Sequence, residues 1–200
     1  MVEICADWHE AAARARLELP SSIGRSPVLR RVRDIADRHE SGHIDAAAFD
    51  RQVAEVTGLT TPQVSRIAEA WLKAPYRGLD ELLERLGSAG VRTACLSNTN
   101  DRHWGVMNEP TSGGCALPLD RLDHRFASHL IGRMKPDEEI YAHVEQACDV
   151  SAESILFFDD NEQNCRAARR LGWQAEQIDP ADDPAARMTE HLVRWGVIGR

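Results

Sequence analysis

The sequence lacks the features that mark membrane-spanning, secreted and zinc-cluster proteins. No apolar run approaches the roughly 20 residues needed to span a bilayer. The first seven residues contain neither the basic segment nor the apolar stretch of a signal peptide. The five cysteines are odd in number and widely spaced, which argues against a disulfide framework and against a zinc site. We therefore expect a cytoplasmic protein with reduced thiols and no membrane partner.

The sequence also contains fewer positively charged than negatively charged residues. The 200 residues contain 24 Lys and Arg against 32 Asp and Glu, which gives a formal net charge of −8. This balance disfavours nucleic acid as the main partner, but it leaves room for an acidic pocket that binds a cation. The 42% hydrophobic and 28% charged residues are typical of a globular protein. The length suits one domain, or one core with a small accessory lobe, and nothing indicates the oligomeric state.

The apolar pattern divides the chain near residue 76. In residues 1–76 the apolar side chains recur at helical spacing, so we predict helices only. The predicted helices cover residues 7–18, 29–39, 45–57 and 61–71. Asp45 and Thr60 are suitable N-caps for two of them, and Gly58 is a suitable stop between these two.

Residues 77–200 alternate between short apolar strands and helices. The predicted strands cover residues 91–96, 126–130, 154–158 and 175–178. The predicted helices cover residues 79–87, 136–148, 161–171 and 185–195. This alternation is typical of an α/β fold with a parallel sheet.

Polar groups stand where an open α/β sheet binds its ligands, at the carboxyl ends of the strands. Ser97 follows the first predicted strand, and the pair Asp159 and Asp160 follows the third. Lys135 lies just before a predicted helix. Each has an ordinary structural explanation, such as a helix N-cap or a solvated loop residue. Together they describe a site in which hydroxyl and lysine groups bind phosphate and the carboxylates bind Mg²⁺.

The order of these groups resembles the haloacid dehalogenase-like (HAD) hydrolase superfamily. Residues 96–100 (Leu-Ser-Asn-Thr-Asn), 133–136 (Arg-Met-Lys-Pro) and 157–161 (Phe-Phe-Asp-Asp-Asn) are similar to its second, third and fourth motifs. Residues 39–44 (His-Glu-Ser-Gly-His-Ile) are similar to a segment in the helical cap of one subfamily. Within that subfamily, the second and fourth motifs are similar to those of α-D-glucose-1-phosphate phosphatase-type sugar phosphatases.

The resemblance implies a fold and an activity. The fold is a Rossmann-like parallel α/β core at residues 77–200, with an all-helical cap formed by residues 1–76. The activity is Mg²⁺-dependent hydrolysis of a small phosphorylated metabolite through a phospho-aspartate, which splits one difficult step into two. The cap would select the substrate, whose identity the sequence does not indicate.

The resemblance also assigns roles to individual residues. Ser97 and Lys135 would be catalytic. Ser97 would bind the phosphoryl oxygens beside the backbone of Asn98, and Lys135 would bridge the phosphoryl group and the nucleophile. Asp159 and Asp160 would hold Mg²⁺. These groups would stabilise the charge that develops on the transferring phosphoryl group.

The family's first motif, a buried strand that ends in the nucleophilic aspartate, has no match in the sequence. Asp7 is the candidate, but it follows a short mixed segment and precedes a helical pattern. We therefore interpret Asp7 as a helix N-cap and not as the nucleophile. We expect a truncated or misassigned start, with the first central strand and the nucleophile absent from this chain. The chain would then be a poor or inactive phosphatase.

Two other functions stay open. A haloacid dehalogenase shares the fold and the nucleophile, but it needs no Mg²⁺ and similar members carry Ser at the place of Asp159 and Asp160. The acidic pair therefore favours a phosphatase. A non-catalytic phosphate-binding protein would keep the pocket without the nucleophile.

Overall fold

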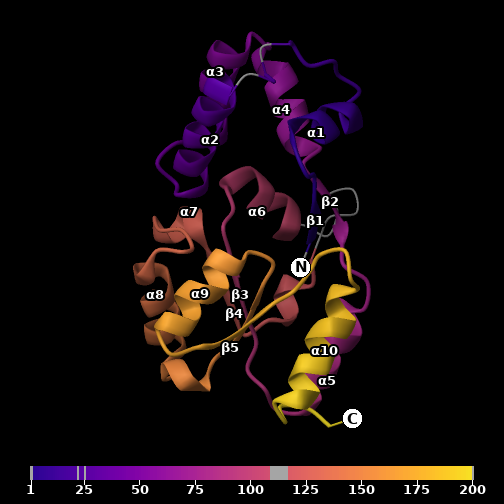
Figure 1. Cartoon of the computed structure of the whole chain (residues 1–200), viewed down its shortest axis with the longest axis vertical. Helices are drawn as coiled ribbons and strands as arrows, with labels where there is room; N and C mark the ends of the chain where they lie inside the picture. The colour runs from indigo at the N-terminus through magenta and orange to yellow at the C-terminus, as the bar shows by residue number, and fades with distance from the viewer. Residues whose placement is uncertain (1, 22, 25, 109–116, 200) are drawn as a thin grey trace.

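The computed structural model has a helical cap above an α/β core (Figure 1). The structure describes residues 2–21, 23–24, 26–108 and 117–199. The cap consists of α1 (Trp8–Arg14), α2 (Ser26–Glu40), α3 (Ala46–Thr57) and α4 (Thr61–Glu69). These helices share one apolar core, at whose centre Val53, Val64 and Ile67 are fully buried.

Local sequence sets the ends of the cap helices, as predicted. The side chain of Asp7 accepts a hydrogen bond from the backbone N–H of Glu10 at 2.9 Å, which confirms that Asp7 is the N-cap of α1. Asp45 caps α3 in the same way, and Thr60 begins α4 with a capping box. Gly58 ends α3 with φ +82°, a left-handed conformation that favours glycine.

The prediction of helices only in residues 1–76 is wrong at the base of the cap. There, β1 (Val2–Ile4) pairs antiparallel with β2 (Leu72–Pro75), so a two-stranded ribbon joins the cap to the core (Figure 1). Both strands are too short to show the alternating pattern of a half-buried strand. Their pairing joins segments about 70 residues apart, which local sequence does not reveal.

The core alternates strands and helices, as predicted. Its strands are β3 (Ala94–Ser97), β4 (His124–Ala127), β5 (Leu156–Asp159) and β6 (Gln174–Gln177). Its helices are α5 (Leu79–Ser88), α6 (Asp101–Asn108), α7 (Ser128–Ile131), α8 (Glu138–Cys148), α9 (Glu162–Arg170) and α10 (Pro184–Arg194), with 3₁₀ turns η1 (Leu119–Arg121) and η2 (Ala152–Ser154). The strand predicted over 126–130 is wrong in its second half, because residues 128–131 form α7.

The strands form two parallel pairs. β3 pairs with β4, with Leu96 opposite Phe126, and β5 pairs with β6, with Phe157 opposite Ala175. Among the described strands, no ladder joins β3 to β5. The absence of a first central strand from this chain stays a prediction.

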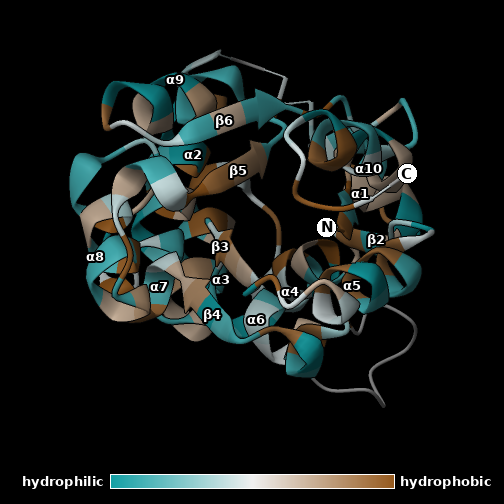
Figure 2. Ribbon diagram, turned by 90° about the horizontal axis from the view of Figure 1, so that it is seen from below, coloured by the Kyte–Doolittle hydropathy of each residue, from teal (hydrophilic) through white to brown (hydrophobic). Residues whose placement is uncertain are grey.

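Apolar helix faces cover the strands on both sides. Tyr141 of α8 packs edge-on against Trp173, at 5.1 Å between ring centroids, and both rings contact Phe157 of β5. On the other side, Leu82 of α5 and Leu192 of α10 belong to a second cluster. Figure 2 shows that β5 is mostly apolar whereas β6 is largely hydrophilic. The packing fixes the carboxyl ends of β3 and β5 beneath the cap.

No described helix is both long and apolar enough to cross a membrane. A cytoplasmic location stays a prediction.

Candidate active site

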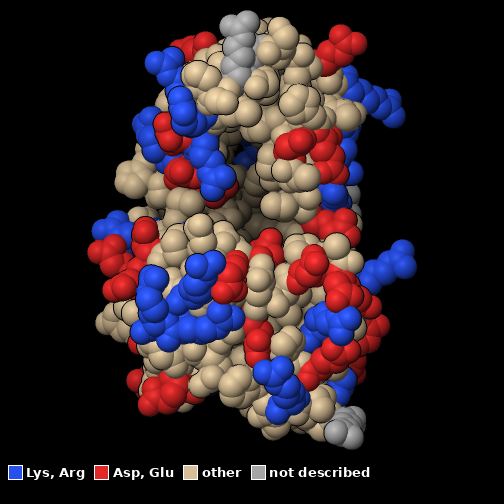
Figure 3. All heavy atoms as spheres, in the orientation of Figure 1, with Lys and Arg blue, Asp and Glu red and all other residues tan. Residues whose placement is uncertain are grey.

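The candidate site lies at the carboxyl ends of β3 and β5, below the cap. Ser97 is the last residue of β3, and Asp159 is the last residue of β5. The face shown in Figure 3 is hollowed between the cap and the core. Each of these two residues therefore lies at the carboxyl end of its own parallel pair of strands, as predicted.

Lys135 joins the two parallel pairs at this edge. Its amine donates to the backbone oxygen of Leu96 in β3 at 2.7 Å and to Oδ2 of Asp159 in β5 at 2.6 Å. The side chains of Lys135 and Asp159 are only 8% and 4% exposed. A buried charge requires a partner, and here each ion is the partner of the other. The lysine and the carboxylate therefore fix each other's position at the carboxyl ends of β3 and β5.

Asn98 holds the backbone of Lys135 with two reciprocal hydrogen bonds. Its Nδ2 donates to the carbonyl of Lys135 at 2.9 Å, and its Oδ1 accepts from the N–H of Lys135 at 2.9 Å. The sequence predicted a role for the Asn98 backbone, and the structure adds this role for its side chain. The residue after Ser97 thus fixes the segment that carries the lysine.

The two neighbouring aspartates have different surroundings. Oδ1 of Asp159 accepts from the N–H of Asn161 at 2.8 Å and from Nδ2 of Asn164 at 2.9 Å, while Oδ2 accepts from Lys135. Asp160 is exposed, and its backbone carbonyl accepts from Gln177. Both oxygens of Asp159 are therefore engaged, whereas the carboxylate of Asp160 faces solvent.

The oxygen atoms at this edge suit Mg²⁺. Besides the two carboxylates, the site contains the buried Oδ1 of Asn164, which has no hydrogen-bond partner. This oxygen is therefore available as a ligand or as an acceptor for a metal-bound water. Mg²⁺ prefers oxygen ligands and commonly keeps several waters beside one or two carboxylates. Among the described residues, no three His, Cys, Asp or Glu side chains are grouped to hold a metal. The residues present therefore fit a hydrated Mg²⁺ and not a closed protein cage.

A buried serine supports the loop that follows β3. Oγ of Ser128 accepts from the N–H of Thr99 at 2.9 Å and lies 3.0 Å from the carbonyl of Thr99. The same oxygen donates to the carbonyl of Glu40, at the end of α2. Ser128 is fully buried. This role has no signal in the sequence, because a serine at the end of a strand is most often a local cap.

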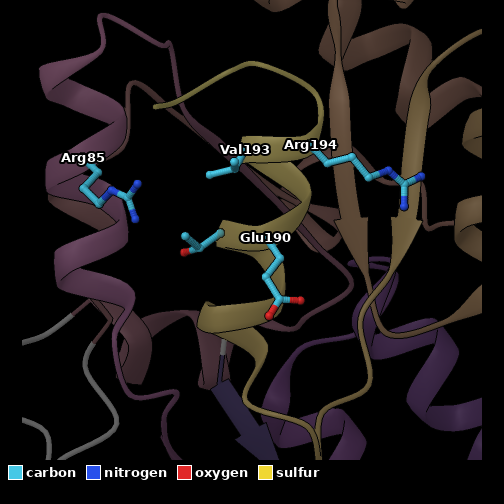
Figure 4. Close-up of a pocket in the computed structure, with 5 residues that line it drawn as sticks. Arg85, Glu190, Val193 and Arg194 are labelled. Carbon is cyan, nitrogen blue, oxygen red and sulfur yellow. The ribbon is translucent and has the colours of Figure 1, made fainter. Parts of the chain in front are cut away.

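Two grooves lie on the described surface. One of about 490 Å³ runs along the cap–core seam and is lined by polar residues that include Arg38, Ser41, His43 and Arg133. The other, of about 640 Å³, lies between α5 and α10. Figure 4 shows its lining, with Arg85 directed towards α10 and Arg194 turned away. None of the predicted site residues belongs to the lining described for either groove.

The sequence and the fold are similar to those of known hydrolases. A family model described as haloacid dehalogenase-like hydrolase matches residues 6–172. A D-ribitol-5-phosphate phosphatase from Bacteroides thetaiotaomicron is 29% identical over 75% of this chain and 74% of its own. The sesquiterpene phosphatase astK from Aspergillus oryzae is 45% identical over 68% of each chain. A solved HAD family enzyme from B. thetaiotaomicron shares the fold, with a TM-score of 0.78 and 22% identity over 94% of this chain and 93% of its own, and was also solved with magnesium and inorganic phosphate.

Proposed function

The chain belongs to the haloacid dehalogenase-like hydrolase family, and on that premise we propose that it is a Mg²⁺-dependent phosphatase. Its substrate would be a small phosphorylated metabolite such as a sugar phosphate. The observation that carries this proposal is the buried Lys135–Asp159 pair, set beside Ser97 at the carboxyl ends of two parallel strands. Two relatives named as phosphatases support the same reaction class.

Each residue has a distinct task in this proposal. The hydroxyl of Ser97 and the backbone N–H of Asn98 bind phosphoryl oxygens, and Lys135 neutralises their charge as a point cation. Asp160 holds Mg²⁺ directly because its carboxylate faces solvent, and Asp159 supports it while anchoring the lysine. Bound Mg²⁺ would supply charge neutralisation on the transferring phosphoryl group.

We expect hydrolysis to be slow. Each aspartate described near the ends of β3 and β5 already has another task. Asp159 is paired with Lys135, Asp160 is assigned to Mg²⁺, and Asp101 is hydrogen-bonded to His39. Asp7 caps α1 at the base of the cap and is not assigned as the nucleophile.

The test measures binding and turnover on the same protein. We expect Mg²⁺-dependent binding of inorganic phosphate by calorimetry, and slow Mg²⁺-dependent hydrolysis of p-nitrophenyl phosphate. Lys135→Met should weaken phosphate binding by at least about 10-fold, since a charge-assisted contact is worth roughly 1.5–3 kcal/mol. Asp160→Asn should remove the Mg²⁺ dependence, whereas Asp7→Asn should change neither measurement.

The other outcomes separate the alternatives. Phosphate binding without any hydrolysis would favour a non-catalytic phosphate-binding protein. Mg²⁺-independent release of chloride from 2-chloropropionate would favour a dehalogenase. A chain that binds no phosphate with or without Mg²⁺ contradicts the proposal, and loss of turnover in Asp7→Asn contradicts our assignment of Asp7.

A further inference from the structure

Three consecutive residues at the start of α6 attach the core to three different cap helices. Asp101 accepts from Nε2 of His39 in α2 at 2.6 Å. Arg102 binds α3, as described below. His103 donates through Nε2 to the backbone carbonyl of Ala68 in α4 at 2.8 Å. Since α6 follows the loop that carries Ser97 and Asn98, the segment directly after the candidate phosphate loop is bonded to three of the four cap helices.

The Arg102 contact is the strongest of the three. Its Nη1 and Nη2 donate to the two carboxylate oxygens of Asp50 in α3, at 2.9 and 2.7 Å. The side chains of Arg102 and Asp50 are only 13% and 7% exposed. A bidentate guanidinium–carboxylate pair fixes both direction and distance. Removing one partner leaves the other as a buried, unpaired charge, so the pair resists separation.

Hydrogen bonds from core residues also fix the same loop, residues 97–100. Ser128 bonds the backbone of Thr99 and also the carbonyl of Glu40 in the cap, as described above. The N–H of His103 donates to Oδ1 of Asn100 at 3.0 Å, which ties the loop to the first turn of α6. Thr99 and Asn100 are 4% and 6% exposed. Thr99 and Asn100 are therefore enclosed between the cap contacts and Ser128, whereas Ser97 and Asn98 are partly exposed.

We propose that Arg102 is a positioning residue that, through Asp50, makes the cap and the phosphate loop (residues 97–100) move as one unit. The position of the cap then sets where Ser97 and Asn98 present their phosphate-binding groups. A substrate that fits the cap would order the loop, and an ion bound by the loop would order the cap, because such coupling is reciprocal. The coupling itself does not depend on phosphatase activity, whereas its effect on phosphate affinity rests on the proposed function.

The test compares two variants that destabilise the cap in different ways. Arg102→Met keeps the length of the side chain but breaks the pair with Asp50. Val53→Ala is the matched control, because Val53 is fully buried in the same helix α3 and takes part in none of the hydrogen bonds described for this network. Amide hydrogen exchange of residues 97–103 reports the loop, exchange of α3 reports the cap, and calorimetry reports the affinity for inorganic phosphate with Mg²⁺.

We expect Arg102→Met to speed exchange in residues 97–103 and in α3 together, and to weaken phosphate binding about 10-fold. Val53→Ala should lower the melting temperature and speed exchange in α3 while leaving loop exchange and phosphate affinity unchanged. The double variant Arg102→Asp with Asp50→Arg, in which the two charges are swapped, should restore in part both the slow exchange of residues 97–103 and the affinity for phosphate. If Arg102→Met does not fold, Arg102→Lys should show a smaller effect in the same direction.

Two results would overturn the proposal. In the first, exchange in residues 97–103 stays at the wild-type rate when the pair is broken. In the second, Val53→Ala with an equal loss of melting temperature loosens the loop as much as Arg102→Met does. If the wild-type chain binds no phosphate, the phosphatase proposal fails alone and the exchange measurements still decide the coupling.

Discussion

At the scale of single residues, the site separates tasks between chemically identical neighbours. Asp159 and Asp160 have the same side chain, but Asp159 is the last residue of β5 and Asp160 lies just beyond the strand, where the chain bends. Asp159 therefore meets Lys135 and Asn164, whereas Asp160 reaches solvent. The sequence predicts an acidic pair at this position, but it cannot assign the two roles, because the difference arises only from the direction of the strand end.

Asn98 offers a sharp test at this scale. Asn98→Ala removes both hydrogen bonds to the Lys135 backbone, and at about 1 kcal/mol each we expect a loss of about 2 kcal/mol in the free energy of unfolding. Phosphate binding should weaken as well, because the lysine segment loses its support. Asn98→Asp should not rescue it, since a carboxylate would face the Lys135 carbonyl. Urea unfolding and phosphate titration measure both effects.

The control is an asparagine outside the site. Asn108 is exposed at the end of α6, where its side chain donates to the carbonyl of Trp104. Asn108→Ala should leave phosphate affinity unchanged. Equal phosphate affinity in the two alanine variants would show that Asn98 does not position Lys135.

At the scale of elements, the end of α2 is seated directly on α7. Gly42 has φ +73°, and a Cβ atom at this position would collide with the carbonyl oxygen of His129 in α7. Gly58 has a similar φ of +82° at the end of α3, but no atom lies within 4 Å of the place that its Cβ would occupy. The two glycines thus share a left-handed backbone conformation, which would strain any other residue, and they differ in the space around them.

This contrast predicts different costs for the same substitution. Gly58→Ala should destabilise the protein by about 1 kcal/mol, the cost of a left-handed alanine. Gly42→Ala should cost at least twice as much, because the cap must also move away from α7. Unfolding in urea measures both free energies. Equal losses would show that the close contact between Gly42 and His129 does not hold the seam.

Elements that depend on adjacent residues could be predicted from the sequence, and elements that depend on distant ones could not. Asp45 and Gly58 mark the two ends of α3 because capping is a local interaction. By contrast, β1 and β2 exist because they pair with each other, and α7 interrupts a segment whose apolar pattern resembles a strand. Arg102 has no local signal at all, since its partner Asp50 lies 52 residues away.

At the scale of the whole molecule, the apolar core of the cap helices is separate from three apolar clusters of the core and the ribbon, and polar contacts join the cap helices to the core. The cap core and the core clusters share no buried residue. The bonds across the seam are made by Asp101, Arg102, His103 and Ser128. Polar contacts specify geometry but contribute little net stability, so we expect the seam to respond to changes in charge more than the two cores do.

Glu40 makes the stability of the molecule depend on pH at this seam. Burial, with the nearby carboxylate of Asp37, raises the pKa of Glu40 from about 4.5 to about 7, against the opposing charge of Arg33. Between these values the folded protein holds a proton that the unfolded chain has lost. The stability contributed by protonated Glu40 is thus fully present below pH 4.5 and is lost as the pH rises to 7.

Glu40→Gln keeps a neutral side chain of the same shape at every pH, so the variant should not lose the stability that the wild type loses between pH 4.5 and pH 7. Relative to the wild type, we expect the variant to gain about 3 kcal/mol in the free energy of unfolding between pH 4.5 and pH 8, and almost nothing further above pH 8. Urea unfolding at matched ionic strength measures this difference. Glu55→Gln, on the exposed face of α3, is the control and should differ from the wild type by the same amount at both pH values. A group whose pKa is the same in the folded and the unfolded protein binds equal numbers of protons in both, so it adds no pH dependence to folding. If the difference between Glu40→Gln and the wild type is also constant with pH, the carboxyl group of Glu40 is not held in its protonated form.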